Sequence, residues 1–179
     1  MIRNWMAGAA LALAAMPGAA LAQDGAKLDC VATSSTPDFK AQVGAAMAGA
    51  GDAASRDALF KQLGTIVDAC VTQHGIADEN KATYFDYSLA RISREWLVGA
   101  IAKSKLQASV VDKALDFGPR GANPDLTGEM SDEQIGKIVG AYIDAGIDIE
   151  TVDETVWEKV GAYAAATSIY WIKRKSLPY

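Results

Sequence analysis

The sequence has only one histidine, two cysteines and no long basic block. One histidine cannot supply a histidine-rich metal site, and two cysteines cannot supply a zinc ribbon or an iron–sulfur cluster, so no metal or other cofactor is expected. The 22 acidic residues outnumber the 17 basic ones, which gives a net charge of −5. Because nucleic-acid binding requires a positive surface, this balance argues against a nucleic-acid partner.

The first 22 residues are typical of a secretory signal peptide. Arg3 precedes an apolar run rich in Ala and Leu, and Pro17 lies just before the cleavage region. Ala20 and Ala22 form the small-x-small site, so cleavage is expected before Gln23. A retained membrane anchor is the weaker alternative, because the apolar run of about 16 residues is shorter than the roughly 20 that span a bilayer.

Cleavage would remove 22 of 179 residues and leave a mature chain of 157 in an oxidising compartment. There, Cys30 and Cys70 are predicted to form a structural disulfide, since they are the only thiols. Such a bridge closes a loop of about 40 residues, for which chain entropy gives roughly 4 kcal/mol. Lipidation of Cys30 is not favoured, because no lipobox precedes it.

Apolar residues recur at helical spacing along the mature chain, and no strand-type alternation competes with them. The sequence therefore predicts an all-α protein with a single compact domain of five to six helices. The expected organisation is a signal peptide over 1–22, a polar and irregular N-terminal segment over 23–35, and a helical domain over 36–179. The predicted helices cover residues 36–49, 52–74, 78–102, 106–117, 131–146 and 151–175.

Local signals mark several helix ends. Thr36 and Pro37 begin one helix, Asp52 or Ser55 caps the next, and Gly75 ends it. A capping box is expected from Thr151 to Glu154. Small side chains over 36–49 predict close approach of another helix, and the same is expected at Gly136 and Gly140.

The helix predicted over 78–102 carries large side chains on two faces, which is typical of a central helix. One face is an apolar stripe made by Phe85, Leu89, Ile92 and Trp96. The opposite face, called the Tyr/Arg face below, carries Tyr84, Tyr87, Arg91 and Arg94. Tyrosine and arginine dominate binding hot spots, and arginine forms bidentate pairs with carboxylates, so we interpret this face as a binding surface for an acidic or carboxylate-bearing partner. In the alternative interpretation, the tyrosines pack against a neighbouring helix and the arginines pair with its acids.

Other candidates for chemistry are weaker. His74 is explained by its position beside the helix-ending Gly75. The acidic residues over 144–154 do not fit the spacing of an EF-hand calcium loop. Glu95 and Glu129 are the candidates for a carboxylate-dependent enzyme, but neither lies in a catalytic motif. The apolar run over 160–172 spans only about 20 Å, too short for a membrane anchor.

The sequence thus favours an exported, non-enzymatic helical protein of a bacterial envelope, periplasmic or secreted. Its expected role is to bind another envelope or secreted protein as an inhibitor or accessory factor. No stable membrane insertion is expected after signal cleavage, and the oligomeric state is left open. One alternative is a helical carrier of a small apolar or anionic ligand, which a cavity of several hundred Å³ would favour. The other is a carboxylate-dependent cell-envelope enzyme.

Overall fold

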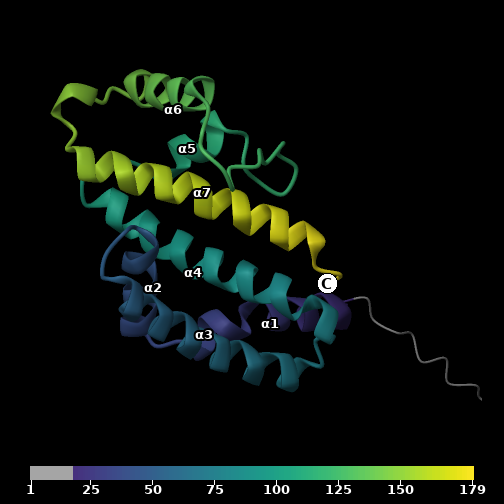
Figure 1. The fold of residues 1–179 in the computed structure, drawn as a ribbon. Coiled ribbons are helices and arrows are strands. Elements are labelled where there is room, and N and C mark those ends of the chain that lie inside the picture. The colour runs from purple at the N-terminus through teal and green to yellow at the C-terminus, as the bar shows by residue number, and fades with distance from the viewer. Residues whose placement is uncertain (1–17) are drawn as a thin grey trace, which may run out of the picture.

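The computed structural model describes residues 18–179, which contain seven α-helices and no strand (Figure 1). This confirms the all-α prediction, with one helix more than expected. Residues 1–17 of the predicted signal peptide lie outside the described range. The helices are α1 (Gly18–Ser34), α2 (Pro37–Met47), α3 (Ala53–His74), α4 (Lys81–Ala102), α5 (Ala108–Ala114), α6 (Asp132–Asp144) and α7 (Glu154–Ser176), with short 3-10 helices η1 (Asp78–Asn80) and η2 (Ile149–Thr151).

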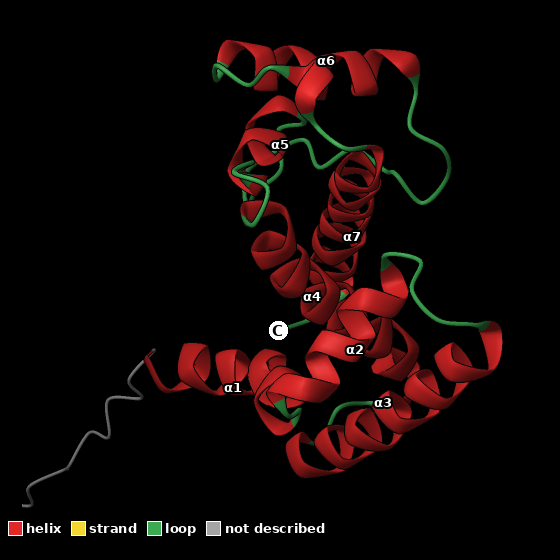
Figure 2. Ribbon diagram, turned by 90° about the vertical axis from the view of Figure 1, so that its left-hand side faces the viewer, coloured by secondary structure: helices red, strands yellow, loops and turns green. Residues whose placement is uncertain are grey.

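The long helices α4 and α7 lie side by side and antiparallel through the middle of the molecule (Figures 1 and 2). Asp86 near the start of α4 pairs with Lys173 near the end of α7 at 2.8 Å, and Arg94 donates a hydrogen bond to Thr167 at 3.2 Å. Helices α1, α2 and α3 pack on one side of α4, whereas α5 and α6 lie at the opposite end of the molecule. Helix α4 contacts helices of both groups, which confirms its predicted central position.

The core consists of two clusters of buried side chains that α4 connects. The first half of α4 contributes Tyr84 and Tyr87 to a cluster shared with α1, α2 and α3. The second half contributes Leu97 and Ile101 to a cluster shared with α5, α6 and α7. Helix α6 reaches the second cluster through Ile138 and Tyr142, so it belongs to the end of the molecule farthest from α1.

The prediction of an irregular segment over 23–35 is wrong, because residues 23–34 belong to α1. Although the segment is mostly polar, it has a short apolar face. Leu28 and Val31 of this face are three residues apart, and both are buried. Contacts with distant residues hold this helix in place: the Tyr84 hydroxyl donates a hydrogen bond to the Lys27 carbonyl at 2.5 Å. Tertiary packing therefore stabilises a helix that local sequence does not favour.

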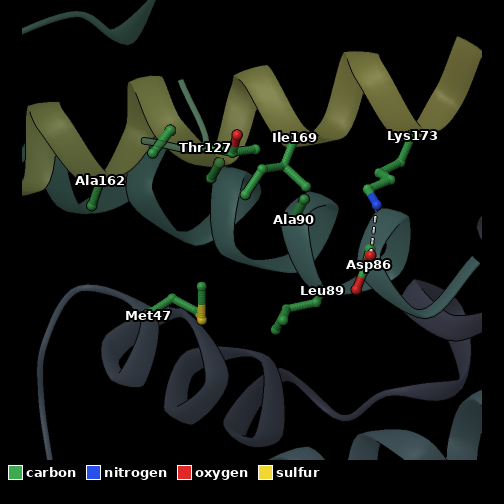
Figure 3. A pocket seen from close by; sticks show the side chains of 10 residues that line it. Met47, Asp86, Leu89, Ala90, Thr127, Ala162, Ile169 and Lys173 are labelled. Atoms are coloured by element: carbon green, nitrogen blue, oxygen red, sulfur yellow. Dashed lines mark ion pairs between the residues drawn. The ribbon is translucent and has the colours of Figure 1, made fainter. Parts of the chain in front are cut away.

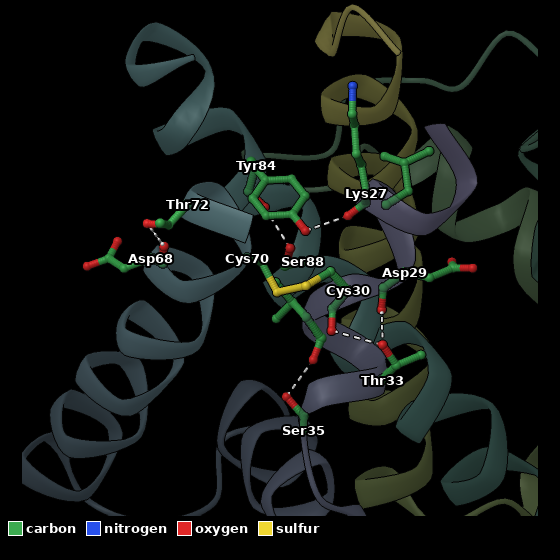
Figure 4. The surroundings of a disulfide bond; sticks show 12 residues. Lys27, Asp29, Cys30, Thr33, Ser35, Asp68, Cys70, Thr72, Tyr84 and Ser88 are labelled. Atoms are coloured by element: carbon green, nitrogen blue, oxygen red, sulfur yellow. Dashed lines mark hydrogen bonds between the residues drawn. A yellow bond between two sulfur atoms is a disulfide. The ribbon is translucent and has the colours of Figure 1, made fainter. Parts of the chain in front are cut away.

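Cys30 of α1 and Cys70 of α3 form the predicted disulfide, with their Cα atoms 5.9 Å apart (Figure 4). Both cysteines are buried in the first core cluster. The bond covalently attaches α1 to α3 beside the Tyr84–Lys27 hydrogen bond. No helix within residues 18–179 is both long enough and apolar enough to cross a membrane.

Several predicted helix ends are confirmed. The Thr36 hydroxyl accepts a hydrogen bond from the Phe39 backbone N–H, and the Asp52 carboxylate accepts one from that of Ser55. Gly75 follows α3 with a φ of 59°, in the left-handed region that favours glycine.

The capping box expected from Thr151 to Glu154 is wrong. Thr151 lies in η2, where its hydroxyl donates to the Asp148 carbonyl, and Asp153 caps α7 instead. A capping box is present at the start of α6, where Ser131 and Gln134 bond reciprocally. In the acidic turn before α7, Thr151 thus bonds to Asp148 within the turn, and Asp153 provides the cap of the helix.

Candidate functional site

The two tyrosines of the Tyr/Arg face are buried. Tyr84 has 0% and Tyr87 has 2% of its surface exposed. Tyr84 contacts α1 through its hydrogen bond to Lys27, and the Tyr87 ring stacks on Tyr170 of α7 with centroids 5.2 Å apart. Burial raises the pKa of Tyr84 to about 12. A side chain without exposed surface is not available to a partner, so Tyr84 is a packing residue.

Arg91 is held by α1 and by its own helix. Its Nη1 donates to the Leu28 carbonyl at 2.9 Å and to the Asp29 carboxylate at 2.5 Å, while its Nε donates to Glu95 at 3.0 Å. Burial opposes the charged form, but the hydrogen bonds to Asp29 and Glu95 outweigh it, so the pKa of Arg91 lies above its ordinary value. Arg91 therefore stays charged and joins α1 to α4.

Arg94 bridges α4, α5 and α7. Its Nη2 donates to Asp112 at 3.2 Å, and its guanidinium lies 5.5 Å from the Tyr163 ring centre. Asp112 also accepts a hydrogen bond from the Tyr163 hydroxyl at 2.8 Å. Both arginines thus have acidic partners within the chain, as in the packing interpretation of the Tyr/Arg face.

Part of the Tyr/Arg face lines a polar surface depression of about 240 Å³. Tyr87, Arg91 and Arg94 contribute to its walls, together with Arg174 from the end of α7. Arg174 donates to the Tyr179 carbonyl at 2.5 Å, so this third arginine is also engaged within the chain. The depression is the part of the Tyr/Arg face that remains open to a partner.

A second hollow, of about 280 Å³, lies between α2, α4 and α7 (Figure 3). Met47, Leu89 and Ile169 surround it, and the Asp86–Lys173 ion pair lies at one end. Small side chains on the facing helices, such as Ala90 and Ala162, leave this space unfilled.

The third hollow is an apolar groove between α6 and α7, with a volume of about 380 Å³. It is open to solvent, and it is larger than either of the other two hollows. Its volume lies within the range of roughly 300–1,000 Å³ that is usual for ligand pockets. The lining residues, which define the α6/α7 groove, are Met130, Ile135, Ile138, Val139, Ile149, Trp157, Val160 and Gly161.

The groove exists because α6 is only partly covered. Ile138 and Tyr142 point into the core, but Ile135 and Ile143 are 44% and 52% exposed. The Tyr142 ring packs edge-on against Trp157 with centroids 5.7 Å apart, and its hydroxyl donates to the Gln107 carbonyl at 3.1 Å. These contacts hold Tyr142 against Trp157, which lines the groove, while Ile135 on the α6 side stays open to solvent.

Close helix contact at Gly136 and Gly140 was expected from their spacing, but no atom outside α6 lies within 4 Å of a β-carbon built at either position. The apolar side of α6 faces the core, so these glycines lie on its uncovered side. In contrast, Gly161 of α7 lines the groove, where a β-carbon would lie 3.7 Å from the Met130 Cε.

The other catalytic candidates do not converge on one site. His74 is the last residue of α3, Glu95 pairs with Arg91, and Glu129 lies exposed in the loop before α6. Among residues 18–179, no group of three His, Cys, Asp or Glu side chains is placed to hold a metal ion.

No protein family, curated protein or solved structure matches this chain. The assignment of a binding surface therefore depends on the residues themselves. The sequence predicted helices over the two segments that contain Ile135 and Trp157, but it did not predict the groove between them. The available signal was the strong amphipathicity of 131–146 next to a stretch dense in turn-forming residues, because such a helix has few neighbours to cover it.

Proposed function

We propose that this protein is an exported, non-enzymatic binding protein of a bacterial envelope, and that it binds another protein through the α6/α7 groove. The observation that carries the proposal is an open, almost wholly apolar groove with an exposed isoleucine, Ile135, at its wall. A groove between two helices matches the way many domains bind an amphipathic helix of a partner.

Export is supported by the sequence of residues 1–22 and is compatible with the Cys30–Cys70 disulfide. The absence of a membrane-spanning helix within residues 18–179 is also compatible with a periplasmic or secreted location. Mass spectrometry of the protein from its native host should find Gln23 at the N-terminus. Recovery of the intact leader in washed membranes would contradict export.

The binding proposal is tested with two matched substitutions on α6. Ile135 and Ile143 are both exposed, but only Ile135 lines the groove. Partner capture from an envelope extract should be lost with Ile135→Asn and retained with Ile143→Asn. Equal capture by both variants would move the binding surface away from the groove, with the depression lined by Arg91, Arg94 and Arg174 as the next site to test.

A second candidate function is a carrier of a small apolar ligand, favoured by the 380 Å³ volume and apolar lining of the same groove. Small-molecule sites usually surround most of the ligand surface, whereas this groove is open along one side. We therefore rank it second. Native mass spectrometry of the protein purified from its host distinguishes the two, since a carrier would retain a bound ligand of defined mass.

A further inference from the structure

We propose that the occupant of the α6/α7 groove is a cationic amphipathic helix of the partner protein. This inference rests on the proposed binding function and identifies the chemistry of the partner. Its basis is the combination of an apolar groove with a concentration of unpaired acidic residues in the segments that form it.

The negative charge of the chain is concentrated around the groove. Residues 125–159, which include α6, η2 and the start of α7, contain ten acidic and two basic residues, a net charge of −8. The remainder of the sequence contains twelve acidic and fifteen basic residues, a net charge of +3. The excess of acid in the whole protein therefore arises entirely from the segment that forms the groove.

Several of these acids are next to groove residues. Glu129 directly precedes Met130, and Glu150 directly follows Ile149. On α7, Glu158 is three residues before Gly161 and is therefore its neighbour on the helix surface. The same relation holds between Asp132 and Ile135 on α6, and between Glu154 and Trp157 on α7. All five acids are exposed.

Within residues 18–179, none of these five acids forms an ion pair. Among the ion pairs within residues 18–179, the one acid of segment 125–159 that takes part is Glu133, which pairs with Lys137 at 2.7 Å. By contrast, Arg91, Arg94 and Lys173 each pair with an acid of the chain. The charge around the groove is thus available to a cation from outside the molecule.

An apolar groove flanked by acids favours one class of binding partner, a cationic amphipathic helix. An apolar stripe at i, i+3, i+4 and i+7 would fill the groove, and Lys or Arg on its flanks would meet the acids. Opposite charges across such a contact accelerate association and exclude unsuitable partners. Nucleic acids and anionic membranes are repelled by the same acids. A second copy of this chain, offering its basic Lys173–Lys175 end, is the rival to be tested.

The test uses the mature disulfide-bonded chain and three synthetic helices of about 18 residues, long enough to form an amphipathic helix. The helices share one Leu/Ala stripe and differ on their flanks, which carry Lys, Gln or Glu. Affinities are measured by isothermal titration calorimetry at low and high salt. Sedimentation velocity on the protein alone measures its oligomeric state.

The Lys helix should bind about tenfold more tightly than the Gln helix, and the Glu helix more weakly than either. High salt should remove most of the difference, because exposed charges are screened. Ile135→Asn should weaken the Lys helix about tenfold, and Ile143→Asn should leave its affinity unchanged.

Charge variants separate the contribution of the acids to binding from that of the apolar groove. Glu154→Gln with Glu158→Gln should weaken the Lys helix but not the Gln helix. Asp57→Asn with Glu79→Gln removes the same charge from exposed sites in α3 and η1, and should have no effect.

Three results would overturn the inference, and each has a different consequence for the proposed function. Equal affinity for all three helices, lost in Ile135→Asn, would retain the groove as a binding surface and discard the cationic partner. Affinity that is indifferent to Ile135→Asn would discard the groove, and with it the proposed function. A dimer that Ile135→Asn dissociates would assign the groove to a second copy of the chain.

Discussion

Gly44 of α2 lies directly against Trp96 of α4: a β-carbon at Gly44 would lie 2.5 Å from both the Cβ and the Cγ of Trp96. Such distances are far inside van der Waals contact, so the two helices approach this closely only because residue 44 has no side chain. The small-sided surface predicted for residues 36–49 is thereby explained. It brings α2 onto the central helix.

Replacement of Gly44 by Ala should therefore destabilise the fold. We expect Gly44→Ala to lower the free energy of unfolding by about 2 kcal/mol, because α2 or Trp96 must move. The matched control is Gly64→Ala in α3, where no atom of residues 18–179 outside α3 lies within 4 Å of the new β-carbon. That change should raise stability by up to about 1 kcal/mol through helix propensity. Urea unfolding followed by circular dichroism measures both, and equal effects would contradict the close packing of Gly44.

The contacts of Arg94 predict a structural role for this residue. Arg94→Ala would leave Asp112 half-buried with one hydrogen bond, from Tyr163, so we expect a loss of about 2 kcal/mol in the free energy of unfolding. The exposed pair Lys137–Glu133 is the comparison, and Lys137→Ala should produce no measurable change. A double-mutant cycle with Asp112→Asn checks the coupling. An unchanged stability of Arg94→Ala, with loss of partner capture, would instead support the Tyr/Arg face as the binding surface.

The disulfide should contribute much of the stability of the α1–α3 end. Cys30→Ser with Cys70→Ser is expected to lower the free energy of unfolding by about 2–4 kcal/mol, since the cross-link restricts the unfolded chain. Hydrogen exchange should show that amides of α1 lose protection first, because α1 is attached at its C-terminal half by this bond and by the Lys27–Tyr84 contact. Alkylation of both cysteines in protein taken directly from the envelope would contradict a native bridge.

Buried tyrosines should make the fold sensitive to alkali. Burial raises the pKa of Tyr84, Tyr142 and Tyr163 to about 12, above the ordinary value of 10.0. The unfolded chain therefore releases these protons at lower pH than the folded chain. The contribution of these three tyrosines to stability should be complete below about pH 9 and should be lost as the pH rises from about 10 towards 12. Urea unfolding across this range measures the decline, and ionisation of all six tyrosines near pH 10 in a still folded protein would contradict it.

The sequence predicted those helix ends that are determined by neighbouring residues. Thr36, Asp52 and Gly75 act within one helical turn, so the ends of α2 and α3 were identified from neighbouring residues. Helix α1 was missed, because its stability depends on Cys70 and Tyr84, which are 40 and 57 residues from their partners.

The candidate site shows the same limit. Helical periodicity correctly grouped the four residues of the Tyr/Arg face on one side of α4. It could not show that Arg91 pairs with Asp29, because the two residues are 62 positions apart in the sequence. Similarly, the pattern of α6 identifies an apolar side without showing how much of it α7 covers. A groove is a property of the distance between helices, and that distance is fixed by the whole fold.

The location of the binding surface is measured most directly by nuclear magnetic resonance. The Lys-flanked helix should shift the backbone amide signals of groove residues, above all Ile135, Val139 and Gly161. The amides of Tyr87, Arg91 and Arg94 should remain in place. Shifts centred on Tyr87, Arg91 and Arg94, with the groove signals unchanged, would contradict binding at the α6/α7 groove.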